Sequence, residues 1–106
     1  MSYDVYLEID TGGDELVEVY DRNYTSNVSR MWRTAGVNLR ELTGMVAADA
    51  VPLLDRAIGA MTAEADTYRA MNPPNGWGDY DGALTFLCDL RAACVKHPKT
   101  TLRVSA

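Results

Sequence analysis

The sequence predicts an α+β fold of two layers, in which helices cover one face of a small antiparallel sheet. Residues 3–9 and 15–20 alternate between apolar and polar side chains on either side of a turn at residues 11–14, as in a β-hairpin. Residues 100–105 alternate again, and the stretch between carries helical periodicity. A three-stranded sheet needs one face covered, so we expect three to four helices there and the last strand beside the first.

Length, composition and charge narrow the class of protein. The 106 residues are 47% hydrophobic, which predicts one domain, residues 1–106, with a core of its own. The formal net charge of −5 argues against general nucleic-acid binding, because that requires a basic surface. The sequence has no apolar run of 18 residues and no basic-then-apolar leader, so we expect a cytoplasmic protein without a membrane span.

The apolar positions of the strands predict the core side of the sheet. Residues 15–20 place Val17 and Val19 on one face and Glu18 and Tyr20 on the other. The inward side chains of the first strand are Tyr3, Val5, Leu7 and Ile9. The expected core packs Leu53, Leu54, Ile58, Leu84, Leu87 and Leu90 against Val5, Leu7, Val17, Leu102 and Val104.

The first helical pattern follows a polar segment at residues 21–27, in which Ser26 or Asn27 can cap a helix. Gly36 is a natural stop for this short helix, and residues 37–43 are expected to add one helical turn. The apolar side chains that repeat at helical spacing in the short helix are Val28, Met31, Trp32 and Ala35.

A long helical pattern runs from about residue 47 to residue 61. Pro52 allows two starts: either the helix begins near Asp49, with Pro52 in its first turn, or it begins earlier and kinks at Pro52. Residues 62–71 predict one more helical segment, capped by Thr62.

The segment from Asn72 to Gly82 separates the last two helical patterns. Pro73-Pro74 is stiff and extended, Asn75-Gly76 is a turn signal, and Asp79 is a good N-cap for a helix over residues 80–96. Trp77 allows two interpretations. The ring closes the edge of the core, as aromatic rings usually do, or it lies on a binding surface, which a rigid loop with an indole and short polar groups suits.

Two polar-aromatic clusters, residues 23–27 and 75–80, precede helix starts and form the candidate site. Free backbone N–H groups at helix starts attract anions, and the amide, hydroxyl and ring groups suit a small polar or nucleotide-like ligand. Alternatively, both clusters are caps that hydrogen-bond each other; in either case we expect them to lie side by side. The candidate ligand-binding residues are Asn23, Tyr24, Thr25, Asn27, Asn72, Asn75, Trp77, Asp79 and Tyr80.

No catalytic residue, metal site or cofactor is predicted. The single histidine, His97, has no nucleophile motif to serve. Asp79 and Asp81 diverge on a helix and make a poor acid pair, although they could support one cation. Cys88 and Cys94 are about 9 Å apart along one helix, too far for a disulfide, so we expect reduced thiols on the core side.

Four segments, distributed over nearly the whole chain, resemble a group of small uncharacterised proteins encoded by actinobacteria and their phages. The segments are residues 3–7, 23–27, 49–54 and 71–82, of which the last, Met-Asn-Pro-Pro-Asn-Gly-Trp-Gly-Asp-Tyr-Asp-Gly, is the most distinctive. The resemblance implies an actinobacterial or phage source. It brings no established activity, catalytic residue or cofactor.

The expected function is that of a non-enzymatic binding protein, encoded by a phage and acting on a host component in the host cytoplasm. The alternative is a small polar-ligand or nucleotide-binding protein, or a minor enzyme, that uses a pocket formed by residues 23–27 and 75–80. The partner is thus a host protein or a small polar ligand, without general nucleic-acid or membrane binding. A homodimer is compatible with the sequence.

Overall fold

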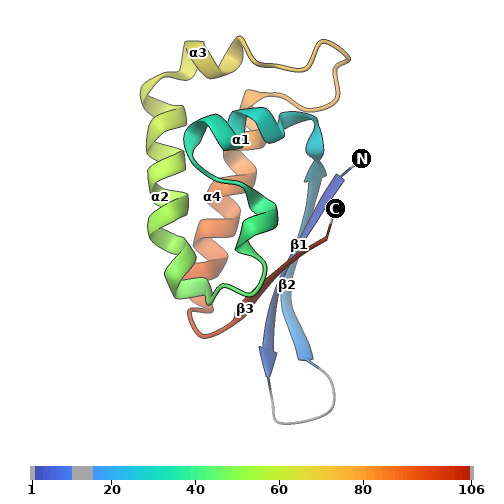
Figure 1. Cartoon of the computed structure of the whole chain (residues 1–106), viewed down its shortest axis with the longest axis vertical. Coiled ribbons are helices and arrows are strands. Elements are labelled where there is room, and N and C mark those ends of the chain that lie inside the picture. The colour runs from blue at the N-terminus through green and yellow to red at the C-terminus, as the bar shows by residue number, and fades with distance from the viewer. Residues whose placement is uncertain (1, 11–15, 106) are drawn as a thin grey trace.

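The computed structural model describes residues 2–10 and 16–105, and its sheet has the predicted strand order (Figure 1). β1 (Ser2–Asp10) lies in the middle, between β2 (Leu16–Thr25) and β3 (Thr101–Ser105), and both neighbours run antiparallel to it. The prediction of a hairpin plus a C-terminal strand beside the first strand is confirmed. The turn expected at residues 11–14 lies outside the described residues.

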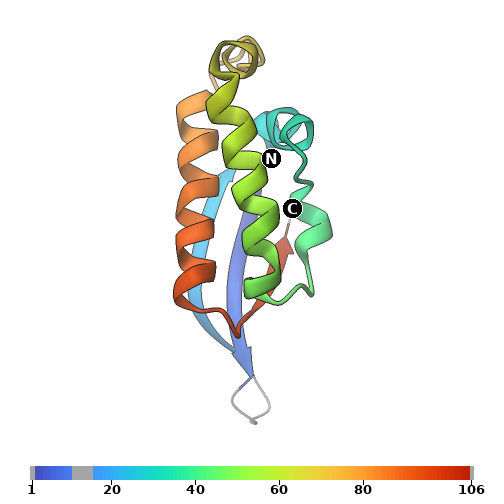
Figure 2. The same ribbon diagram turned by 90° about the vertical axis from the view of Figure 1, so that its left-hand side faces the viewer.

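The helices cover one face of this sheet, with α2 and α4 side by side in front of the strands in Figure 2. The helical elements in chain order are η1 (Ser26–Val28), α1 (Ser29–Ala35), η2 (Leu39–Leu42), α2 (Ala47–Ala63), α3 (Ala65–Arg69) and α4 (Tyr80–Lys96). Gly36 ends α1 with φ +106°, as predicted, and α4 has the predicted bounds. The α+β architecture is therefore confirmed.

The core forms between the helices and the inner face of the sheet. Val5 and Leu7 of β1 are fully buried, as the alternation predicts, and they face the buried side chains of α2 and α4. Aromatic rings fill the core where α1 meets α4. The Trp32 and Phe86 ring centroids are 5.2 Å apart, and the indole N–H of Trp32 donates to the Ala83 carbonyl at 3.1 Å. Burial of these large side chains is the main stabilising contribution.

β2 is longer than the expected strand at residues 15–20, because it continues to Thr25. Its last residues pair with the start of β1, Thr25 opposite Ser2 and Asn23 opposite Asp4. Residues 21–25 were expected in a polar segment before a helix, and that assignment is wrong. The cap is also different, since Thr25 accepts a hydrogen bond from the backbone N–H of Asn27.

Val17 does not belong to the core, contrary to the prediction. It pairs with Ile9 where the two strands extend past the end of the helical layer (Figure 1), and the two side chains are 47% and 38% exposed. A register shift between Leu7 and Glu8 also leaves Val19 38% exposed. The other predicted core members with partial burial are Leu53, Ile58, Leu84 and Val104, which pack at the margin of the core.

The start of α2 agrees with the earlier of its two predicted starts, whereas the start of α3 differs from the sequence prediction. α2 begins at Ala47, so Pro52 lies inside the helix, which excludes a start near Asp49. Thr62 does not cap the next helix, because α2 continues to Ala63 and the Thr62 hydroxyl donates to the Ile58 carbonyl at 2.7 Å. None of the helices in residues 2–10 and 16–105 is both long and apolar enough to span a bilayer.

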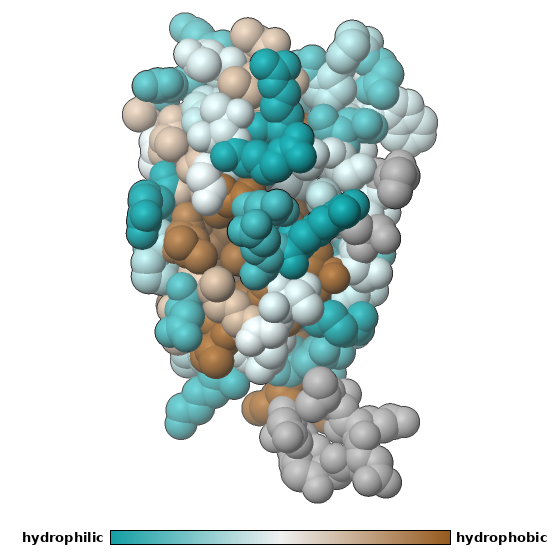
Figure 3. Space-filling view, viewed as in Figure 1, coloured by the Kyte–Doolittle hydropathy of each residue, from teal (hydrophilic) through white to brown (hydrophobic). Residues whose placement is uncertain are grey.

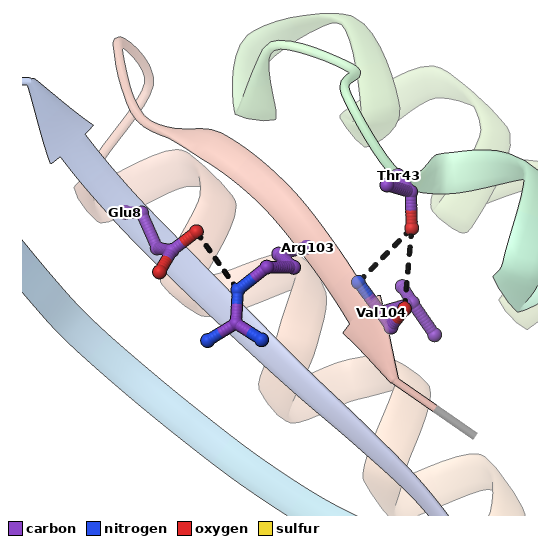
Figure 4. A network of polar contacts seen from close by, with 4 residues as sticks. All are labelled: Glu8, Thr43, Arg103 and Val104. Atoms are coloured by element: carbon purple, nitrogen blue, oxygen red, sulfur yellow. Dashed lines mark hydrogen bonds and ion pairs between the residues drawn. The ribbon is translucent and has the colours of Figure 1, made fainter. Parts of the chain in front are cut away.

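The segment after η2 covers the outer edge of β3. The Gly44 N–H donates to the Leu102 carbonyl at 2.8 Å, and the Leu102 N–H donates to the Met45 carbonyl at 2.9 Å. The Thr43 hydroxyl oxygen accepts from the Val104 N–H at 3.0 Å (Figure 4). These bonds satisfy backbone groups that an uncovered edge strand would expose to pairing with other chains.

The two cysteines have different surroundings. Cys94 is fully buried, as expected, but Cys88 is exposed, so its predicted place on the core side is wrong. Both are free of disulfide bonding. Burial raises the pKa of the Cys94 thiol to about 11.

We expect Leu87→Ala to lower the free energy of unfolding by about 2–5 kcal/mol, because Leu87 is fully buried and the substitution leaves a cavity. Val95→Ala is the matched control on the same helix: Val95 is 52% exposed, and its loss should change stability by less than about 0.5 kcal/mol. Urea denaturation measures both. A loss below about 1 kcal/mol for Leu87→Ala would contradict the packing of this helix face.

We expect a thiol-specific disulfide reagent to modify Cys88 rapidly in the folded protein and Cys94 only after denaturant is added. The thiolate is the reactive form, and Cys94 is both inaccessible and hard to deprotonate. Cys88→Ala should abolish the fast phase and keep the slow one. Rapid modification of two thiols in native protein would disagree with the placement of Cys94.

Candidate functional site

The two predicted clusters lie side by side, and Tyr24 joins them. The Tyr24 hydroxyl accepts a hydrogen bond from the backbone N–H of Asp79 at 3.3 Å, which connects the end of β2 to the start of α4. The ring of Tyr24 packs into the core, 6.0 Å from Phe86 and 6.3 Å from Trp32 between centroids. The expected juxtaposition of residues 23–27 and 75–80 is therefore present at this contact.

Two glycines make the close approach possible. A Cβ atom at Gly82 would overlap the hydroxyl of Tyr24, and its ring carbon Cζ would lie only 2.7 Å away. A Cβ atom at Gly78 would meet the Thr25 methyl group at 2.5 Å, and Gly78 also has φ +90°. The clusters thus meet through steric contact, with Tyr24 and Thr25 filling the space between them.

The loop at residues 72–79 is held by its own polar side chains. The Asn72 amide oxygen accepts from the Tyr80 N–H at 2.8 Å, and the Asn75 amide oxygen accepts from the Trp77 N–H at 2.9 Å. The Asp79 carboxylate accepts from the Gly82 N–H at 2.7 Å, which confirms its predicted role as N-cap. These three side chains therefore hydrogen-bond backbone N–H groups of the loop and of the first turn of α4.

Trp77 differs from these side chains, because its ring points into solvent and does not hold the loop. Its side chain is 67% exposed, so the interpretation that the ring closes the edge of the core is wrong. Tyr80 takes a buried position instead: the residue is 4% exposed, and its hydroxyl donates to the Met61 carbonyl at 2.8 Å. The chain thus buries Tyr80 and presents Trp77 to solvent.

The amides of the first cluster do not reach the second cluster. The Asn23 amide donates to the Asp4 carboxylate at 2.7 Å, on the face of the sheet opposite the helices. The Asn27 amide donates to the Thr25 hydroxyl at 3.0 Å. Of the candidate residues in β2 and η1, Tyr24 and Thr25 contact the loop, whereas Asn23 and Asn27 are paired elsewhere.

A second polar surface lies on the sheet face away from the helices, and the sequence prediction missed it. Asp4, Tyr6, Asp21, Arg22 and Asn23 line a shallow cavity of about 320 Å³ there. The signal was present in the alternation of β1, whose outward positions carry an aromatic ring between two acids.

The described residues offer no metal site, and the chain matches no known protein. Within residues 2–10 and 16–105, no group of three or more His, Cys, Asp or Glu side chains is placed to hold a metal ion. Comparison with protein-family models, with curated proteins and with solved structures finds no match.

We expect Gly82→Ala to destabilise the protein by about 1–3 kcal/mol, although alanine is the better helix former, because the new methyl group displaces Tyr24. Gly59→Ala in α2 is the matched control. A Cβ atom there meets nothing within 4 Å, so this change should stabilise by about 0.5–1 kcal/mol. Urea denaturation measures both variants.

Tyr24→Phe tests the cause of that loss. The added methyl group collides mainly with the Tyr24 hydroxyl, so the effects of the two substitutions should be coupled. Gly82→Ala should therefore lower stability less in the Tyr24→Phe background than in the wild type. Equal stabilisation by Gly82→Ala and Gly59→Ala would show that Tyr24 does not pack against α4.

Proposed function

We propose that the chain is a non-enzymatic interaction protein that binds a protein partner through Trp77. The observation that carries the proposal is the exposure of this indole, 67% against 1% for Trp32. A few residues supply most of the binding energy at protein interfaces, and tryptophan is strongly enriched among them. An indole kept in solvent by a fixed loop supports a role in recognition.

The order of the loop supports the same proposal. Gly76 and Gly78 flank the ring with φ +77° and +90°, a backbone conformation that other residues rarely adopt. The Gly76 N–H donates to the Pro73 carbonyl at 3.3 Å, and the Asn75 side chain holds the Trp77 N–H. A loop that is ordered before binding loses less conformational entropy when the partner arrives.

The indole acts as a single anchor rather than as part of a broad apolar surface. Side chains over the loop, at the upper right of Figure 3, are pale or hydrophilic, and apolar side chains gather lower, over the helical layer. Interface anchors of this kind insert into a pocket of the partner and are surrounded by polar contacts. We therefore infer a partner with an apolar pocket that accepts the ring.

The contact between the clusters favours a protein partner over the small-ligand alternative. Tyr24 and Thr25 already fill the space against Gly78 and Gly82, so a ligand between the clusters would have to open that contact. The resemblance to actinobacterial and phage proteins supports a component of the host cell as the partner.

We expect Trp77→Ala to abolish capture of the partner from an extract of an actinobacterial host, because truncating an anchor of this kind costs about 2 kcal/mol or more, roughly 30-fold in affinity. The immobilised chain is incubated with extract, and retained proteins are quantified by mass spectrometry. The folded state should be unaffected, since Trp77 is mostly exposed.

Val95→Ala, at an exposed apolar position of α4, is the matched control and should retain the same proteins as the wild type. Equal retention by Trp77→Ala would exclude the ring as the anchor. Thermal unfolding with a nucleotide panel tests the alternative, because a ligand at 100 times its Kd stabilises by about 2.7 kcal/mol. Such a shift without Trp77-dependent capture would favour a small ligand instead.

A further inference from the structure

The sheet face away from the helices, here called the open face, carries a row of paired polar side chains. Tyr6 in the central strand lies opposite Arg103 of β3 on one side and opposite Asp21 of β2 on the other. Directly paired residues in antiparallel strands share one face with their Cβ atoms about 5 Å apart. In Figures 1 and 2 the described helices lie on the opposite side of the sheet.

On the β3 side, the open face already holds a guanidinium group of the chain itself. The Arg103 guanidinium carbon lies 4.1 Å from the centroid of the Tyr6 ring, and Nε of Arg103 donates to the Glu8 carboxylate at 3.0 Å (Figure 4). The hydrogen bond to Glu8 raises the pKa of Arg103. An aromatic ring beside a carboxylate is thus shown here to bind a guanidinium, by cation–π and ionic attraction.

The β2 side of Tyr6 offers the same groups, and its one basic lining residue, Arg22, has its guanidinium paired elsewhere. The cavity of about 320 Å³ lies there, lined by Asp4, Tyr6, Asp21, Arg22 and Asn23. The side-chain carboxylate of Asp21 makes no hydrogen bond or ion pair within the described part of the chain, and the neighbouring Arg22 pairs with Asp89 of α4. Asp4 accepts from the Asn23 amide, which holds this carboxylate beside the cavity.

The net charge of the open face favours the same ligand. Its described side chains include four carboxylates against the single guanidinium of Arg103, and the whole chain carries −5. The carboxylates are Asp4, Glu8, Glu18 and Asp21. A face of this charge attracts basic segments and repels phosphate-bearing partners such as nucleic acids.

We propose that the open face binds an arginine side chain of a basic protein segment, with the guanidinium seated in the cavity between Tyr6 and Asp21. This site is separate from the proposed Trp77 anchor and does not depend on it. The two surfaces are nevertheless continuous. Asp21, Asn23 and Thr25 follow one another on the same face of β2 over about 13 Å, and Thr25 contacts the loop at Gly78.

The test is an NMR titration of the ¹⁵N-labelled chain with an acetylated, amidated tetra-arginine peptide. We expect saturable shifts of the backbone amides of Asp4, Tyr6, Asp21 and Asn23. Asp21→Asn should weaken binding about threefold or more, because it removes the carboxylate that faces the guanidinium. Tyr6→Phe should bind like the wild type, whereas Tyr6→Leu should bind more weakly, because only the ring is needed for stacking.

Asp66→Asn is the matched control, since it removes the same charge from a fully exposed side chain on α3 and should leave the affinity unchanged within about twofold. Trp77→Ala should also bind the peptide normally, which separates this test from that of the proposed function. Equal weakening by Asp21→Asn and Asp66→Asn would overturn the proposal, since it would mean attraction by net charge alone. Shifts confined to other surfaces would overturn it as well.

Discussion

The contact of Tyr24 with the start of α4 connects the sheet, the core and the loop. Its ring belongs to the aromatic group that includes Trp32 and Phe86, and its hydroxyl holds the Asp79 N–H at the point where the loop ends. Gly82 provides the room for that hydroxyl at a helix position where glycine is otherwise unfavourable. This contact fixes the end of the loop against the sheet, while the loop's own side chains hold the backbone around Trp77.

Local patterns predicted the parts of the fold that local chemistry determines. The apolar spacing and the caps of α4 predicted its bounds, and the alternation of apolar and polar residues predicted the strands β1 and β3. The extension of β2 through Asn23 and Thr25 was missed, because pairing with β1 and not residue type makes these polar residues a strand. Val17 was misplaced because strand length relative to the helical layer is a tertiary property.

In the candidate site, too, local chemistry was predicted from the sequence, whereas most tertiary features were not. Asp79 was predicted as a cap from its position alone, and the meeting of the two clusters was expected from their surplus of polar groups. The sequence left two interpretations of Trp77 open, since burial is the usual state of a large ring and only the loop conformation decides between burial and exposure. The open face around Tyr6 was missed because cross-strand pairs exist only once the register is known.

The opposite surroundings of Trp32 and Trp77 have a practical consequence. One indole lies in the core and the other in solvent, and the sequence contains only these two. Indole fluorescence depends on solvent contact, so the emission of the native protein is the sum of a buried and an exposed emitter. A red shift of the Trp32 component would report loss of the core, and a blue shift of the Trp77 component would report coverage of the loop. The chain therefore carries separate optical reporters for folding and for occupancy, without any added label.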